Sequence, residues 1–303
     1  MTESIDQLAL AISNVSHVER PYLHNLLTIK KFEIAKEPID IEHREALSKV
    51  TMWETERHNL DAWTLQWLLA KATCSIQSEK DRTQKGLEKA KVLVAETEEK
   101  VRQENDKIHQ VEVQNEKYAV DYRELQKYRE EFLVLLDKAL PNETSKTQEY
   151  KDRIEETKQK SQEKFENIKK LDKVKEYLKN ADLALLEAIL ELRASTVKES
   201  LMGQGKVYFP ETAYECLAKA REEYPDLPGF ASPTEYVNEA DNTGAYYSPM
   251  QKYLWDVRKK IADLILWCDE EAISLLDKET ELQIELGQYT DEYNLRRRDA
   301  LKK

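Results

Sequence analysis

The stretch 87–136, LEKAKVLVAETEEKVRQENDKIHQVEVQNEKYAVDYRELQKYREEFLVLL, decides the fold. Apolar residues recur near every 3.5 positions, the spacing that keeps one face of an α-helix toward a partner. These a and d positions hold Leu87, Ala90, Val94, Val101, Ile108, Val111, Tyr118, Tyr122, Leu125, Phe132 and Leu136. Residues 39–140 contain no proline and a single glycine, Gly86. We therefore expect one coiled-coil helix from Asp40 to Leu140, about 150 Å long.

Polar residues interrupt this apolar series at a few inward-facing positions. They are Thr97, Glu104, Asn115 and Arg129. A polar side chain in such a position lowers stability but favours a single alignment of the paired helices. The pattern predicts one defined register for this helix.

Two further long helices are predicted downstream. Pro141–Thr144 reads as a short turn, and a second helix is expected over 147–201. A short turn between long helices indicates an antiparallel hairpin, here spanning 39–202. Ser248-Pro249-Met250-Gln251 is a helix start signal, so a third long helix is expected over 249–303, packing on the hairpin.

The rest of the chain completes an all-α prediction. Residues 1–38 read as short N-terminal helices ended by Pro38, and 203–248 as an acidic insert with proline and glycine. One short helix is expected inside that insert, over Glu211–Tyr224. The predicted fold is an elongated antiparallel helical coiled coil with three long helices and a helical-bundle end.

Charge and cysteine content limit the function classes. The net charge of −12 argues against nucleic acid as a partner, because phosphate binding needs a basic surface. Cys74, Cys216 and Cys268 are far apart, which favours reduced thiols in the cytoplasm over disulfides or a zinc site. The acidic N-terminus is unlike a signal peptide, and the apolar stretch Ala62–Ala70 is too short to span a membrane. A cytoplasmic protein is predicted.

No residue pattern in the chain predicts an enzyme or a cofactor site. The sequence has no nucleophile–base pair and no complete metal-ligand set, since Glu54 and His58 have a suitable spacing but no evident third ligand. We therefore expect a non-enzymatic scaffold or tethering protein. In the predicted hairpin the apolar stretch 181–192 faces the polar stretch 96–107, and the excess apolar surface favours a homodimer. The candidate self-association seam is Leu183, Leu186, Leu190, Ile265 and Leu276.

Two groups of basic residues suggest an alternative function at an anionic membrane surface. The candidate contacts are Lys169, Lys170, Lys173, Arg296, Arg297, Arg298, Lys302 and Lys303. In the number and length of its predicted helices, 40–303 resembles the BAR-type membrane-curvature proteins. That resemblance implies a dimer of three long, kinked helices that binds anionic lipid.

Overall fold

The computed structural model describes residues 2–61, 76–140, 145–194, 210–229 and 249–301. Its helices are α1 (Thr2–Val15), the 3-10 turn η1 (Ser16–Val18), α2 (Glu19–Asp61), α4 (Ile76–Ala139), α5 (Ser145–Ala194), α6 (Glu211–Glu223) and α7 (Pro249–Leu301). These ranges contain no strand. The predicted all-α class is confirmed.

The chain divides into two compact units. The first comprises 1–141 together with 297–303, and the second comprises 142–296. This boundary falls within the turn expected over Pro141–Thr144, which lies outside the described residues. The last residues of α7 therefore belong to the same unit as α1, although they are distant in the sequence.

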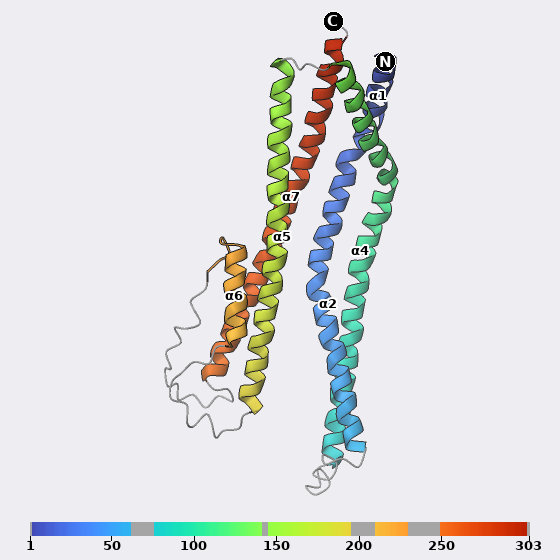
Figure 1. Cartoon of the computed structure of the whole chain (residues 1–303). Coiled ribbons are helices and arrows are strands. Elements are labelled where there is room, and N and C mark those ends of the chain that lie inside the picture. The colour runs from blue at the N-terminus through green and yellow to red at the C-terminus, as the bar shows by residue number, and fades with distance from the viewer. Residues whose placement is uncertain (1, 62–75, 141–144, 195–209, 230–248, 302–303) are drawn as a thin grey trace. The chain divides into compact units, whose positions relative to one another are not determined.

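In the first unit, α2 and α4 lie side by side and antiparallel (Figure 1). Glu42 pairs with Lys100 at 3.0 Å, and nearer the other end Asp61 pairs with Lys80 at 2.7 Å. Asp61 and Lys80 are 19 residues apart, which would be about 28 Å in a continuous helix. The single helix predicted for 40–140 is therefore wrong. Apolar periodicity identifies the inward face of a helix but does not say where the chain reverses.

The predicted end of a helix at Pro38 is also wrong. α2 runs through Pro38 without a break, from Glu19 to Asp61. Proline in a helix interior removes one hydrogen bond and costs about 3 kcal/mol. The ring of Pro38 is exposed, so it displaces no interior side chain. The packing of α2 along α4 on both sides of this residue outweighs that local cost.

The second unit is built from α5, α6 and α7. The ion pairs Lys175–Asp269 and Asp182–Arg258 show that α5 and α7 lie antiparallel. α6 packs on α5, with an ion pair between Lys173 and Glu223. The buried apolar residues of the two long helices include Leu171, Val174, Leu178, Ala181, Leu185, Leu254, Val257, Ile261 and Leu264. The interior thus includes the apolar stretch 181–189 of α5 and the facing side of α7.

Gly86 lets α2 approach α4 closely. A Cβ atom at this position would lie 2.6 Å from Cε2 of the Trp53 ring. Alanine favours a helix over glycine by about 1 kcal/mol, but the overlap with an indole ring costs about 1–3 kcal/mol. We expect Gly86→Ala to lower the free energy of unfolding, measured by urea denaturation. In a Trp53→Leu background, where the ring is absent, the same change is expected to raise it.

Candidate interaction surfaces

A buried ion pair joins the start of α2 to α4. The Arg129 guanidinium donates hydrogen bonds of 2.5 and 2.8 Å to the two carboxylate oxygens of Glu19. Only 8% and 9% of these side chains are exposed. On the same helices the rings of Tyr22 and Tyr122 stack with centroids 4.2 Å apart. Burial, and secondarily the Glu19 carboxylate, raises the pKa of the Tyr122 hydroxyl. The pair favours one alignment of α2 on α4, because any shift would leave a buried charge unpaired.

Other polar residues of α4 also face the interior. Thr97 is fully buried, and its hydroxyl forms a 3.0 Å hydrogen bond with Nδ1 of His43 on α2. Asn115 and Arg129 are buried, and Glu104 is half-buried. The prediction that these positions face inward is confirmed for Thr97, Asn115 and Arg129. At Thr97 and Arg129 a shifted register would lose a polar contact between α2 and α4.

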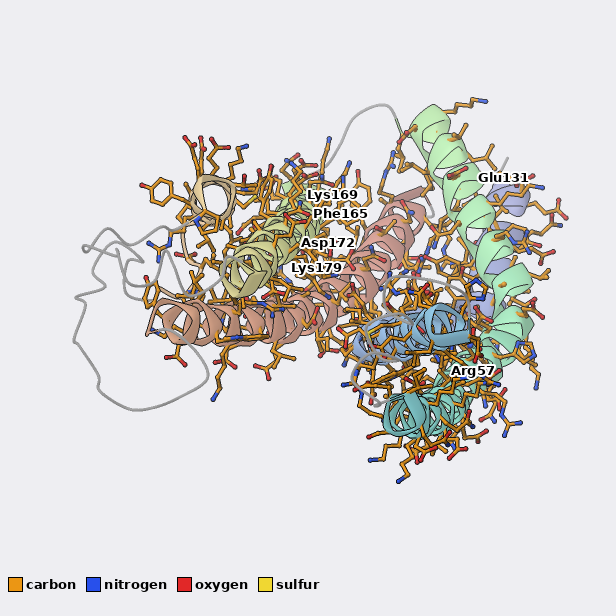
Figure 2. The ribbon with its side chains drawn as sticks, turned by 90° about the horizontal axis from the view of Figure 1, so that it is seen from below. Arg57, Glu131, Phe165, Lys169, Asp172 and Lys179 are labelled. Atoms are coloured by element: carbon orange, nitrogen blue, oxygen red, sulfur yellow. The ribbon has the colours of Figure 1, made fainter. Side chains whose placement is uncertain are left out.

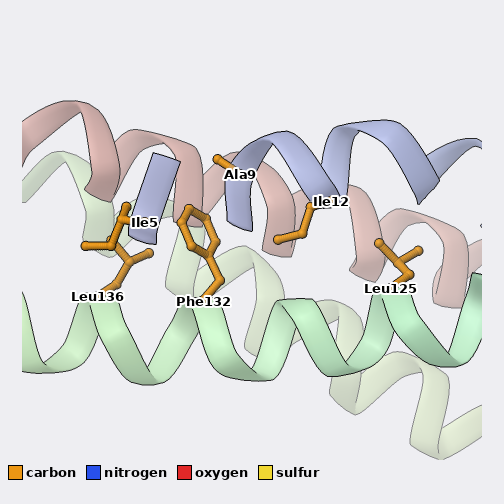
Figure 3. Close-up of a cluster of buried hydrophobic side chains, with 6 residues drawn as sticks. All are labelled: Ile5, Ala9, Ile12, Leu125, Phe132 and Leu136. Carbon is orange, nitrogen blue, oxygen red and sulfur yellow. The ribbon is translucent and has the colours of Figure 1, made fainter. Parts of the chain in front are cut away.

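The short helix α1 packs its apolar side onto α4 (Figure 3). Three residues of α1 and three of α4 form one buried cluster, made of Ile5, Ala9, Ile12, Leu125, Phe132 and Leu136. Leu301, at the end of α7, packs against the same cluster. The sequence pattern indicated α1 as a helix, but it did not indicate α4 as its partner.

In the basic C-terminal group, Arg297 and Arg298 make contacts inside the first unit. Arg297 is 4% exposed and donates a 2.7 Å hydrogen bond to Asp137 of α4. Arg298 is half-buried and pairs with Asp6 of α1 at 3.8 Å. The assignment of Arg297 as a membrane contact is therefore wrong, because a buried guanidinium cannot reach lipid. Arg296 is exposed, and Lys302 and Lys303 lie outside the described residues.

The basic residues predicted on α5 are exposed. Phe165, Lys169, Asp172 and Lys179 lie along one face of this helix (Figure 2). The Lys169 ammonium lies 4.3 Å from the centre of the Phe165 ring. Lys170 and Lys173 are also exposed, and Lys173 pairs with Glu223 of α6 at 3.2 Å. Acidic residues are interspersed on this helix, so the exposed surface carries both signs of charge.

The candidate self-association seam is only partly exposed. Leu183 is 55% exposed, whereas Leu186, Ile265 and Leu276 are half-buried. The side chain of Leu190 lies outside the described residues. The neighbours Ala181, Leu185, Ala188 and Ile189 are buried. Helices of the same unit thus cover most of the described part of the apolar stretch from which the seam was predicted.

An exposed apolar series on α4 was missed by the sequence reasoning. Val113, Val120 and Val134 are 43%, 55% and 50% exposed. Val113 and Val120 are seven residues apart, and Val134 follows Val120 by twice that spacing. All three lie on the face of α4 opposite the inward a and d positions. A second apolar series offset from the first was the signal that could have identified them.

Three features of the described residues bear on chemical reactivity. No group of histidine, cysteine, aspartate or glutamate side chains among them could hold a metal ion. A depression of about 260 Å³ lies between α2 and α4, lined partly by Asp61 and Lys80. Lys80 donates a hydrogen bond to Asp61 and lowers the pKa of that carboxyl, so it stays ionised. Burial raises the pKa of the Cys268 thiol to about 11, which makes it a poor nucleophile near neutral pH.

Within the described ranges, no helix is both long and apolar enough to cross a membrane. Comparisons with protein-family models, with curated proteins and with solved structures found no match to this chain.

Proposed function

We propose that this protein is a non-enzymatic coiled-coil scaffold that associates with a second copy of itself. The observation that carries the proposal is the exposed valine series Val113, Val120 and Val134 on α4. Scattered apolar residues are ordinary on a protein surface, but a repeat at heptad spacing is typical of a helix that packs on another helix.

Three further features support a structural role. The long helices pair through buried polar residues such as Arg129, which favour a defined alignment over maximal stability. The free thiols Cys216 and Cys268 suit a reducing compartment, so the proposed location is the cytoplasm. Long paired helices also separate their two ends by a large distance, as a spacer or tether requires.

The molar mass in solution tests this proposal. We expect sedimentation equilibrium of the full chain at micromolar concentration to give twice the 35.5 kDa of one chain. Apolar contacts tolerate salt, so the dimer should persist when the ionic strength is raised. A stable monomer over the same concentration range would contradict the proposal.

A membrane-binding function is the second candidate, supported by exposed Lys169 beside the Phe165 ring and by exposed Lys170. Co-sedimentation with anionic vesicles tests this membrane-binding function when the wild type is compared with a Lys169→Glu/Lys170→Glu variant. Arg297 is unsuitable for this comparison because its substitution would break a contact inside the first unit.

A further inference from the structure

The outward face of α4 carries a regular apolar series. Val113, Val120 and Val134 lie on one face, and Lys127 occupies the remaining seven-residue position. Each valine is two residues away from a side chain that faces the interior of the first unit. Two residues correspond to a rotation of about 200° around the helix axis, so the valines face away from that interior. Valine loses side-chain freedom in a helix and gains nothing in return when it faces water. A recurring valine face is therefore expected to be covered.

Charged residues of both signs lie between these valines. They are Glu116, Lys117, Arg123, Glu124, Lys127, Glu130 and Glu131, and all are exposed. Acidic and basic side chains are interspersed along this face of α4, so the face has no large net charge of either sign. Such a surface favours a partner with an equally mixed pattern, and it offers little to nucleic acid or an anionic membrane.

We propose that a second copy of this chain lies antiparallel on this face, with the twofold axis near Asp121. The inference rests on the self-association proposed above, and it names the surface and the orientation. In a parallel pair in register each charge meets its own copy, so Glu116 faces Glu116 and Lys127 faces Lys127. In the antiparallel pair Glu116 of one copy comes level with Lys127 of the other.

The antiparallel arrangement also brings a longer polar side chain level with each valine: Val113 comes level with Glu130 of the other copy, and Val134 with His109. Val120 comes level with Arg123 of the other copy, whose aliphatic stem can pack on it while the guanidinium stays in water. Lys117 comes within one turn of Glu124. Because the axis is twofold, every such pair occurs twice. Opposite charges therefore meet where the parallel arrangement would place like charges.

A charge swap within one pair tests the surface and the orientation together. In the full chain, Glu116→Lys and Lys127→Glu each place like charges against one another at two symmetric points. We expect each single variant to raise the dimer Kd about tenfold. The double variant Glu116→Lys/Lys127→Glu restores opposite charges and is expected to return the Kd to the wild-type value. Sedimentation equilibrium at low ionic strength measures all four proteins.

The matched control is a charge swap on the second unit. Glu156 and Lys160 are exposed on α5 and pair with each other at 2.6 Å, so their exchange should leave the dimer Kd unchanged. Circular dichroism should show equal helix content in every variant, since all altered side chains are exposed. A dimeric wild type with unaffected single variants would overturn this inference alone. Single variants that weaken the dimer without rescue by the double variant would overturn the antiparallel orientation, and a monomeric wild type would overturn the proposed function as well.

Discussion

Arg129→Met is expected to lower the free energy of unfolding of the first unit by about 3–5 kcal/mol. The substitution keeps much of the side-chain volume but leaves the Glu19 carboxylate buried and without its two charge-assisted hydrogen bonds. A buried carboxylate that loses its partner must either stay charged in a poorly solvated place or take up a proton. Urea denaturation followed by circular dichroism measures the loss.

The double variant Glu19→Leu/Arg129→Met separates the cost of an unpaired charge from the value of the pair. Replacing both members of a buried ion pair by apolar side chains is often neutral or stabilising, so this variant is expected to recover most of the loss. The exposed pair Glu42–Lys100 is the matched control. Lys100→Met should cost about 1 kcal/mol at most, because water solvates the remaining carboxylate. Equal losses from Arg129→Met and Lys100→Met would show that the buried pair has no special role.

Phe132→Ala is expected to cost about 3–5 kcal/mol and to loosen α1 from α4. Phe132 is 1% exposed, and its ring extends from α4 toward α1, near Ile5 and Ala9 (Figure 3). Its removal takes away the largest side chain of that cluster and leaves a cavity that a short helix cannot refill. Hydrogen exchange measured by mass spectrometry should show faster exchange over 2–15, with the second unit unchanged.

The neighbouring residue supplies the control for this prediction. Leu133 is 39% exposed, on the same helix and one position away. Leu133→Ala should change stability by less than about 1 kcal/mol and leave exchange in α1 as in the wild type. Faster exchange spread evenly over both units would contradict a local role for Phe132.

The all-helical class and the starts of α6 and α7 were predictable from this sequence. The start of α7 at Pro249 was predicted from the sequence signal Ser248-Pro249, which is local. α6 begins at Glu211 as expected. The inward faces were predictable for the same reason, because apolar spacing near 3.5 residues depends only on helix geometry. Leu125, Phe132 and Leu136 occupy predicted positions and are buried.

The partners of these faces were not predictable. An apolar stripe on one long helix resembles the stripe on every other, so the pairing depends on where the chain reverses and on which polar residues meet. Glu19 and Arg129 are 110 residues apart, and nothing in either local sequence relates them. The same limit explains why Arg297, in a run of three arginines, was expected at a surface but is buried against Asp137.

The sequence by itself determined that the chain is helical and which side of each helix is apolar, because these properties arise within a few turns of backbone. Only the tertiary structure decided that α4 packs on α2, that Arg297 is internal, and that Val113, Val120 and Val134 are left facing water. Each of these features depends on side chains that are far apart in the chain. Their burial and pairing contribute to the free energy of folding only when the helices pack together.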